Sequence, residues 1–257
     1  MHFFRLILPA LAILMSATAV AAPDPSALKL ASVNAAVAYA GSDKLVVDKN
    51  ANRVVPIASL TKLMTALVVL DSGQPLNEWL EVYPRHKPPA TNAYSRIRKG
   101  SELRRGEMLR IALMSSENLA AYTLARHYPG GYDAFIKAMN SKATELGMTR
   151  SRFVDPSGLS VDNQSTAADL LKLVQAAARH PEIGDYSTTR YHRAQFRNPR
   201  YSLSYGNTNA LVHRDSWGVE LSKTGYLDDA GRCLVMLMEL NGKQMVTVFL
   251  DSFGSRS

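Results

Sequence analysis

The sequence predicts a mixed α/β fold of the α+β type, in which an antiparallel sheet is flanked by helices and a helical subdomain is inserted. Strand-like segments lie near both ends of the chain, and residues from about 76 to 184 have a mostly helical pattern. A strong turn signal, Asn241-Gly242, joins two of the late strands as a hairpin. Strands at both ends that enclose a helical middle favour a sheet closed by the two ends of the chain.

The early elements follow from apolar spacing. Residues 35–39 and 45–48 are small, apolar or β-branched, and Gly41-Ser42-Asp43 between them has turn chemistry, so we expect a hairpin. A helix should follow over residues 59–70. Its apolar positions cover most of the helix circumference, which predicts a buried helix; they are Leu60, Leu63, Met64, Leu67, Val68 and Leu70.

The later elements follow from the same patterns. We expect helices in the middle of the chain at residues 105–114, 119–127, 132–146 and 166–179. Strands return at residues 219–224, 233–240 and 244–250, separated by Gly231 and by the Asn241-Gly242 turn.

The composition is typical of one folded domain. The chain has 257 residues, of which 46% are hydrophobic and 20% are charged, and these values exclude disorder and collagen-like repeats. No repeat, low-complexity tract or linker divides the chain. We expect a single domain over residues 23–257, with its sheet part at about 28–75 and 185–257 and its helical insert at about 76–184.

The first 22 residues predict a secretory signal peptide. Arg5 precedes an apolar stretch at residues 6–15, and small residues follow at Ala19, Ala21 and Ala22. An uncleaved anchor helix is the alternative, but the stretch is shorter than the ~20 residues that a membrane span needs. No later segment reaches that length. We therefore expect a mature chain that lies outside the cytoplasm and has no integral membrane segment.

Charge and motifs exclude several classes of function. The formal net charge of +8 favours acidic partners, such as nucleic acid, anionic lipid or acidic cell-wall polymer. The single cysteine, Cys233, excludes an intrachain disulfide and a cysteine-based metal cluster, and we expect it to be a buried strand residue. No Gly-x-Ser-x-Gly, Gly-rich phosphate loop, His-Glu-x-x-His or His-x-His is present. We expect no metal and no other cofactor.

The first candidate for catalysis is Ser59, in the segment Ser59-Leu60-Thr61-Lys62 at the start of the predicted buried helix. A serine hydroxyl is a poor nucleophile unless a base lies within hydrogen-bonding reach. Positions i and i+3 share one face of a helix, so Lys62 is aimed back at Ser59. Lysine serves as a base only where burial or nearby cations lower its pKa. The backbone N–H groups of a helix N-terminus suit a developing oxyanion.

Two further motifs strengthen this hypothesis, because Ser-x-x-Lys alone is weak and Ser26-Ala27-Leu28-Lys29 also matches it. Ser116-Glu117-Asn118 falls where the helical pattern breaks, and a serine and an amide there can relay a proton and hold a substrate carbonyl. Lys223-Thr224-Gly225 ends a late strand. Lys223 and Thr224 can bind a carboxylate, and Gly225 lets a substrate backbone approach the strand edge. Taken alone, Ser116 and Asn118 could instead be helix caps, and Lys223 could instead be a solvated charge on a strand.

The three motifs in this order resemble the penicillin-binding protein and serine β-lactamase superfamily. Further segments resemble the D-alanyl-D-alanine endopeptidase branch of its low-molecular-weight penicillin-binding proteins, between about residues 35 and 253. They are Pro56-Ile57-Ala58, Met114-Ser115, Tyr128-Pro129-Gly130-Gly131-Tyr132, Asp155-Pro156-Ser157-Gly158-Leu159-Ser160 and Asn207-Thr208-Asn209.

The resemblance implies a β-lactamase/transpeptidase-like fold and a periplasmic serine peptidase that cleaves D-alanyl to diaminopimelate cross-links in peptidoglycan. It implies that Ser59 is the acylating nucleophile, Lys62 its base and Ser116 a proton relay. Asn118 would contact a substrate amide, and Lys223 and Thr224 the terminal carboxylate. The backbone N–H groups of Ser59 and Tyr226 would form the oxyanion hole. β-Lactam antibiotics would be covalent inhibitors.

Three alternative functions share these motifs. A D-alanyl-D-alanine carboxypeptidase has the same chemistry, but the anchored members carry a second β-rich domain and a terminal amphipathic helix, and this sequence stops at Ser257 with neither. It also ends earlier than we expect for the endopeptidase branch. A serine β-lactamase of one class needs a Glu-x-x-Leu-Asn for deacylation, and none lies between Ser116 and Lys223. In a non-catalytic β-lactam sensor we would expect at least one of the three motifs to be damaged, and all three motifs are intact here.

The basic segment at residues 96–110 can contact the acidic peptides of the wall or form a solvated charged face. Glu102 and Glu107 interrupt it, which favours the solvated face. We expect no nucleic-acid binding, because aromatic residues are not interleaved with these cations and the compartment is wrong.

Overall fold

A computed structural model describes residues 28–86 and 94–253 of the chain, so the expected signal peptide at residues 1–22 lies outside the described residues. A five-stranded antiparallel sheet has the strand order β2-β1-β11-β10-β9, which makes β2 and β9 its edges. The bounds of these strands are β1 Ser32–Tyr39, β2 Leu45–Lys49, β9 Val219–Leu227, β10 Gly231–Leu240 and β11 Lys243–Ser252.

The sheet is closed by the two ends of the chain, as the sequence predicts. β1 pairs with β11 along its length, from Ser32 opposite Ser252 to Tyr39 opposite Met245. The hydroxyl oxygens of Ser32 and Ser252 are 2.6 Å apart. The Asn241-Gly242 turn joins β10 to β11, and both of its residues have positive φ angles (51° and 73°), as a tight hairpin turn of this type requires.

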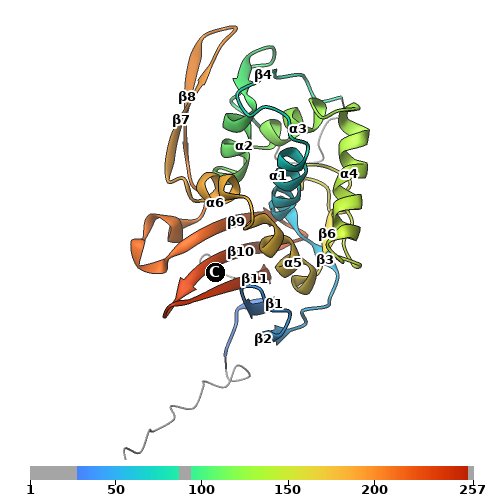
Figure 1. The fold of residues 1–257 in the computed structure, drawn as a ribbon, viewed down its shortest axis with the longest axis vertical. Coiled ribbons are helices and arrows are strands. Elements are labelled where there is room, and N and C mark those ends of the chain that lie inside the picture. Colours follow the sequence, from blue (N-terminus) through green and yellow to red (C-terminus); the bar gives the residue numbers. More distant parts are fainter. Residues whose placement is uncertain (1–27, 87–93, 254–257) are drawn as a thin grey trace, which may run out of the picture.

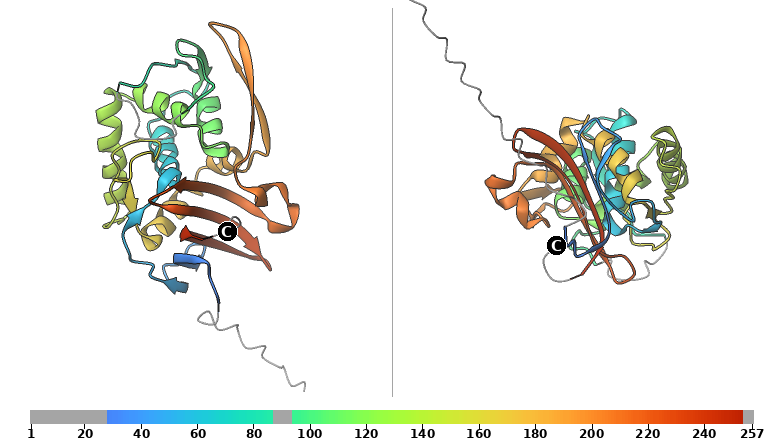
Figure 2. Two further views of the ribbon diagram at one scale, coloured as in Figure 1. Left: turned by 180° about the vertical axis from the view of Figure 1, so that it is seen from behind. Right: turned by 90° about the horizontal axis from the view of Figure 1, so that it is seen from below.

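Helices gather on one side of the sheet and above its β9 edge (Figures 1 and 2). Helix α5 packs on β1, β10 and β11, and α6 packs on β9. Helix α1 rises from the sheet, with α2, α3 and α4 packed around it. The bounds are α1 Thr61–Asp71, α2 Arg105–Met114, α3 Asn118–Arg126, α4 Gly131–Glu145, α5 Ala167–Ala177 and α6 Pro181–Thr188.

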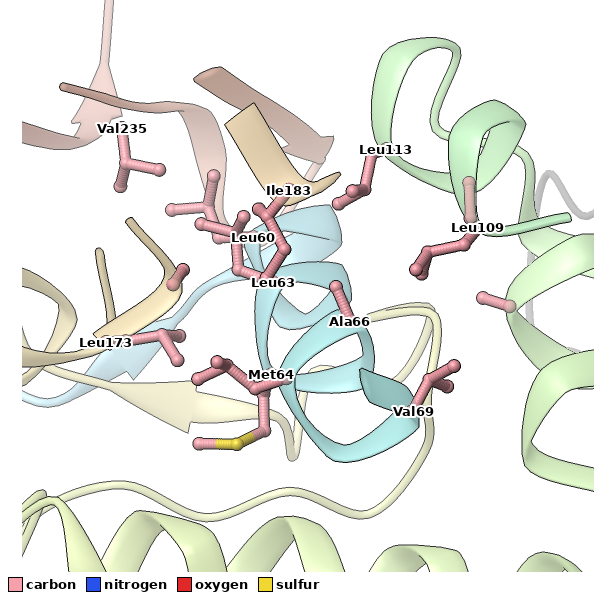
Figure 3. Close-up of a cluster of buried hydrophobic side chains, with 14 of the residues drawn as sticks. Leu60, Leu63, Met64, Ala66, Val69, Leu109, Leu113, Leu173, Ile183 and Val235 are labelled. Atoms are coloured by element: carbon pink, nitrogen blue, oxygen red, sulfur yellow. The ribbon is translucent and has the colours of Figure 1, made fainter. Parts of the chain in front are cut away.

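The buried helix expected over residues 59–70 forms the centre of the molecule. Every residue of α1 from Thr61 to Val69 is buried. Figure 3 shows its apolar side chains in one buried cluster with Leu113 of α2, Leu173 of α5, Ile183 of α6 and Val235 of β10. Burial of one such side chain contributes about 1.5–3 kcal/mol to folding. The position of α1 is therefore fixed from all sides, which holds the residues at its N-terminus in place.

The early hairpin, the four helices of the middle region and the three late strands are all present near their expected positions. One expectation is wrong. Lys223-Thr224-Gly225 does not end its strand, because β9 continues to Leu227.

Several elements were not expected from the sequence. A long hairpin of β7 and β8 rises beside α2, and α6 precedes it (Figure 1). The other unexpected elements are short; the bounds of all these strands and 3₁₀ helices are β3 Val55–Pro56, β4 Trp79–Glu81, β5 Glu102–Arg104, β6 Gln164–Ser165, β7 Tyr191–Phe196, β8 Tyr201–Gly206, η2 Ala58–Leu60, η3 Ala210–His213 and η4 Asp215–Trp217. Within the described ranges, no helix combines the length and apolarity that a membrane span needs.

Candidate active site

Ser59 lies in the one-turn helix η2, which leads directly into α1. The turn is tightly constrained from two sides. A Cβ atom at Gly158 would lie 1.9 Å from the carbonyl oxygen of Ala58, and one at Gly225 would lie 3.0 Å from the backbone nitrogen of Ser59. Ala58 itself has a φ of 47°, a conformation that costs free energy for a residue with a Cβ. The backbone around Ser59 is thus held between two glycines.

This arrangement gives Gly225 a further role, while the role expected from the sequence stays a prediction. From the sequence, we expect that the lack of a side chain at Gly225 lets a substrate backbone come close to the strand. In the structure, the backbone that comes close is that of the chain itself, at Ser59. Gly225 therefore allows the η2 turn to pack on β9 and so sets the distance between Ser59 and the edge of the sheet.

Lys62 lies at the expected position relative to Ser59. Its Nζ is 2.9 Å from the hydroxyl oxygen of Ser59, the contact predicted from their spacing on a helix. The same nitrogen donates to Oδ1 of Asn118 at 2.8 Å and to the backbone carbonyl of Ser157 at 2.5 Å. Three oxygens from three segments of the chain therefore fix the lysine with its nitrogen against the candidate nucleophile.

The environment of Lys62 lowers the pKa of its ammonium group. The side chain is fully buried, and desolvation lowers the pKa from 10.5 to about 7. The carboxylates of Asp155 and Glu117 oppose this shift, and the charge of Arg85 adds to it. Burial is the cause that the sequence argument named. Near neutral pH, a large share of Lys62 is uncharged and able to accept a proton.

The loop that carries Ser157 is organised by Asp155. Its Oδ1 accepts hydrogen bonds from the backbone N–H and the hydroxyl of Ser157 and from the N–H of Gly158, each at 2.7 Å. Its Oδ2 accepts from the N–H of Ser160 at 2.8 Å and from the amide of Asn163 at 2.6 Å. Sequence reasoning gave this aspartate no role of its own. It is a positioning residue, because it holds the carbonyl that accepts from Lys62.

Ser116 and Asn118 lie where α2 is joined to α3, one between the two helices and the other within α3. Ser116 lies between the helices with a positive φ of 58°, and Asn118 is the first residue of α3 rather than a loop residue. Glu117 caps α3 by accepting from the N–H of Ala120 at 2.7 Å. Asn118 contacts Lys62, whereas the Ser116 hydroxyl has no hydrogen bond to another described residue. The roles of Ser116 as a proton relay and of Asn118 as a substrate contact stay predictions.

Lys223 and Thr224 lie on β9, which is an edge strand of the five-stranded sheet. Lys223 is buried and donates to the carbonyl oxygen of Thr224 at 2.8 Å. Burial, and then the charge of Lys62, lower the pKa of Lys223 well below 10.5. The Thr224 hydroxyl is 2.7 Å from that of Thr208, whose N–H donates to Met114. Thr208 thus ties β9 to the end of α2, a contact that sequence reasoning did not find.

Tyr226 follows Gly225 on β9. Its phenol is exposed and donates to Asp228 at 2.9 Å, and this hydrogen bond, with the charge of Asp228, raises the pKa of the phenol. The side chain is therefore exposed to solvent and held by Asp228. The oxyanion hole expected from the N–H groups of Ser59 and Tyr226 stays a prediction.

The basic segment at residues 96–110 does not form one charged face. Arg105 is buried and contacts Glu78 at 2.5 Å, and Arg110 pairs with Asp185 at 3.1 Å. Arg96 donates to the carbonyl of Ser204 at 2.7 Å. These arginines join the segment to neighbouring elements. Cys233 is buried on β10 as expected, and burial raises the pKa of its thiol to about 11.

Comparisons with known proteins agree with the motifs. A model of peptidase family S11, described as D-alanyl-D-alanine carboxypeptidase, matches residues 17–254. The chain is 50% identical to the D-alanyl-D-alanine endopeptidase of Escherichia coli over 95% of this chain and 77% of that protein. It is 47% identical to the D-alanyl-D-alanine endopeptidase of Pseudomonas aeruginosa over 93% of this chain and 79% of that protein.

Solved structures show the same fold. The Streptomyces K15 DD-transpeptidase has a TM-score of 0.79 and 26% identity, over 88% of this chain and 92% of that one. Penicillin-binding protein D2 of Listeria monocytogenes, solved in a cefotaxime-bound form, has a TM-score of 0.76 and 30% identity, over 88% and 92% of the two chains. These matches confirm the β-lactamase/transpeptidase-like fold expected from the sequence. Because a family model covers nearly the whole chain and half of its residues are identical to one member, the chain belongs to peptidase family S11, the D-alanyl-D-alanine carboxypeptidase family of serine peptidases.

Proposed function

We propose that this serine peptidase hydrolyses D-alanyl to diaminopimelate cross-links in peptidoglycan through an acyl-enzyme on Ser59. The observation that carries the proposal is the contact of 2.9 Å between the Ser59 hydroxyl and a fully buried lysine. With its pKa lowered to about 7, Lys62 is able to act as a general base at neutral pH.

The reaction has two steps. In the first, Lys62 Nζ takes the proton of the Ser59 hydroxyl as its oxygen bonds to the D-alanyl carbonyl carbon. The carbon–nitrogen bond of the cross-link then breaks, and the leaving amine takes up a proton from Lys62, either directly or through the Ser116 hydroxyl. In the second step, a water molecule loses a proton to Lys62 and attacks the acyl carbon. The bond from that carbon to the Ser59 oxygen then breaks, Lys62 returns the proton to the serine oxygen, and the released D-alanyl carboxylic acid ionises.

Lys223 and Thr224 would bind the carboxylate next to the leaving amine. In the cross-link, the carbon that carries the reacting nitrogen of diaminopimelate also carries a carboxylate, as does the free D-alanine that a carboxypeptidase releases. The same residues therefore suit both leaving groups. Charge supports this assignment, since burial disfavours the ammonium form of Lys223 and a bound carboxylate would stabilise it.

The relatives support the endopeptidase over the carboxypeptidase. The two proteins at 50% and 47% identity are both named D-alanyl-D-alanine endopeptidase, whereas a Bacillus subtilis carboxypeptidase is 28% identical. The cefotaxime-bound relative supports covalent inhibition of Ser59 by β-lactams. We place the reaction in the periplasm, after export through the signal peptide at residues 1–22.

Digestion of purified sacculi tests the proposal. The protein should convert cross-linked muropeptide dimers to monomers, seen by chromatography, and Ser59→Ala should leave the dimers intact. Loss of D-alanine from pentapeptides, with the dimers untouched, would make the protein a carboxypeptidase instead. Rapid turnover of penicillin by the same preparation would make it a β-lactamase, and acylation by penicillin without hydrolysis of either peptide would make it a sensor.

A further inference from the structure

Two stretches of the chain that are far apart in the sequence carry cations and no carboxylates. Residues 82–101 contain five lysines and arginines and no aspartate or glutamate. Residues 186–214 contain five arginines and again no acidic residue. The second stretch includes the whole β7–β8 hairpin, which the mechanism above does not use.

The structure brings parts of the two stretches side by side. The guanidinium of Arg96 donates to the carbonyl of Ser204 on β8 at 2.7 Å, and Arg193 of β7 is paired with Ser204 across the hairpin. The backbone N–H of Arg98 donates to the hydroxyl of Tyr201 at 3.0 Å, next to Arg200 at the tip of the hairpin (Figures 1 and 2). Exposed cations of both stretches therefore gather on one surface. We call it the basic ridge, and it consists of Arg96, Arg98, Lys99, Arg193 and Arg200.

The charges of the basic ridge have no counter-charge close by. Within the described ranges, none of its five cations lies within 4.0 Å of a carboxylate, whereas the neighbouring Arg197 is paired with Glu102 at 2.6 Å. Arg96 lies over the ring of Tyr205 and Arg98 over that of Tyr201. A guanidinium stacked on a ring keeps N–H groups at its rim for a ligand. The ridge thus presents positive charge in a partly fixed arrangement.

Strand β8 connects the basic ridge to the candidate active site. It ends at Gly206, whose carbonyl accepts from the Ser115 hydroxyl at 2.5 Å, and Thr208 beyond it contacts Thr224. At about 3.4 Å per residue, Tyr201 lies roughly 17 Å along the strand from Gly206. Thr224 is on the leaving-group side of the proposed reaction. A polymer that leaves the active site on that side therefore passes the ridge.

The chemistry of the basic ridge suits carboxylates that are repeated along a polymer. Four of its five cations are arginines, and a planar guanidinium binds a carboxylate through two parallel hydrogen bonds. The acidic stem peptides of peptidoglycan carry such carboxylates. Half of the ridge comes from the hairpin, so the charged segment at residues 96–110 did not reveal this surface by itself.

We propose that the basic ridge binds carboxylates of stem peptides that neighbour the one being cleaved, and so retains the protein on peptidoglycan. The inference rests on the proposed function, which supplies the polymer. Because the ridge lies apart from Ser59, it acts on the polymer and not on the bond that is cut. Its binding should weaken with salt, since exposed charges are screened over about 8 Å at physiological ionic strength.

Reversal of two charges tests the basic ridge. Lys99→Glu combined with Arg200→Glu is the ridge variant, because neither side chain has a hydrogen bond or ring contact with another described residue. Lys44→Glu combined with Arg53→Glu is the matched control, since it also reverses one exposed lysine and one exposed arginine, on either side of β2 and far from the hairpin (Figure 1). Both pairs are made in mature protein that carries Ser59→Ala, so that sacculi stay intact. Thermal melting checks the fold of each protein.

Co-sedimentation with purified sacculi gives the apparent Kd. The ridge variant should bind about tenfold more weakly than its Ser59→Ala parent, the size expected if each of about four units of charge contributes a factor of about two at an exposed site. The control should stay within about twofold of the parent, and high salt should remove the difference. Sacculi whose carboxylates have been coupled to ethanolamine should bind the parent and the ridge variant equally weakly.

The catalytically active protein gives a second readout. The rate of monomer release from sacculi, divided by kcat/KM for a soluble cross-linked dimer, should fall in the ridge variant and not in the control. An unchanged ratio would place the effect of the ridge outside catalysis on the polymer and overturn the proposal.

The outcomes separate this inference from the proposed function. Equal binding of the ridge variant and the control to sacculi overturns it. Loss of binding to phosphatidylglycerol vesicles but not to sacculi also overturns it, because the partner is then an anionic lipid surface. If the ridge variant loses its binding to sacculi but the wild-type protein cleaves no dimer, the proposed function fails while the binding surface stands.

Discussion

Gly158 packs directly on the carbonyl of Ala58, the residue before the candidate nucleophile, so closely that a Cβ atom at position 158 would lie 1.9 Å from that oxygen. The contact joins the loop organised by Asp155 to the turn that carries Ser59. A Cβ atom could not be accommodated by a change of side-chain rotamer, because the obstructing atom belongs to the backbone of Ala58.

Gly158→Ala should therefore lower both stability and acylation. Relief of the overlap requires movement of the Ser59 turn, and overpacking of this kind costs about 1–3 kcal/mol. Gly73→Ala is the matched control, since Gly73 also has a positive φ (66° against 82°) but nothing within 4 Å of the added Cβ. Denaturant unfolding and the rate of penicillin labelling measure the two effects. Equal losses in the two variants would show that φ alone is responsible.

Ser59→Ala should abolish covalent labelling by penicillin and leave the fold intact, because it removes the acyl acceptor and little else. Ser26→Ala, in the other Ser-x-x-Lys segment, should be labelled like the wild type. Intact mass measurement followed by peptide mapping reads both results. Label retained by the purified Ser59→Ala protein would disprove the assignment of the nucleophile.

Lys62→Ala should slow acylation by a factor of about 10² or more, the usual scale for a positioned general base. Lys29→Ala is the control, because Lys29 is exposed and lies three residues after Ser26. Stopped-flow measurement with a chromogenic cephalosporin gives the rates. A similar small loss in both variants would mean that Lys62 is not the base.

The rate of acylation should rise as the pH increases through about 7. Lys62 has a pKa of about 7, so below that pH it is protonated and unable to accept the serine proton. The expected profile is a limb with its midpoint near pH 7 and a higher rate above it, up to the pH at which Lys223 loses its charge. Acylation rates across pH 5–9 in buffers of constant ionic strength give the midpoint. A midpoint near 10, the ordinary range for lysine, would contradict the effect of burial.

Asp155→Asn should shift that midpoint to lower pH. The Asp155 charge raises the pKa of Lys62, so its removal leaves desolvation less opposed. The variant also replaces an acceptor with an amide that faces N–H donors, and the unfolding free energy should fall by about 1.5–3 kcal/mol. Asp162→Asn, an exposed carboxylate in the same loop, is the control. An unchanged midpoint would show that Asp155 acts on stability alone.

Local spacing explains what the sequence predicted well. The Ser59–Lys62 contact depends on one helical turn, and the helix at residues 105–114 depends on the spacing of its own apolar residues, so both followed from periodicity. The buried state of Lys62 followed from the apolar residues around the same helix.

Contacts between distant segments explain what the sequence did not predict. The Ser157 carbonyl and Lys62 lie 95 positions apart, and no pattern within either segment indicates the other. The same holds for Thr208 and Thr224, and for Gly225, whose packing partner is the backbone of Ser59. The β7–β8 hairpin was missed because few of its residues are buried: Ala194 and Phe196 on β7 and Tyr205 on β8.

The pairing of β1 with β11 determines when the active site can be complete. Among the described strands, β9, which carries Lys223, pairs only with β10. β10 leads to β11, and β11 is joined to β1 by residues as far apart as 220 positions. An isolated hairpin of two strands is marginal in water. Before β10 and β11 have been made, we expect Ser59 and Lys62 to be present in the chain while β9, and with it Lys223, is not yet fixed beside them. Topology alone then delays activity until β11 has been made.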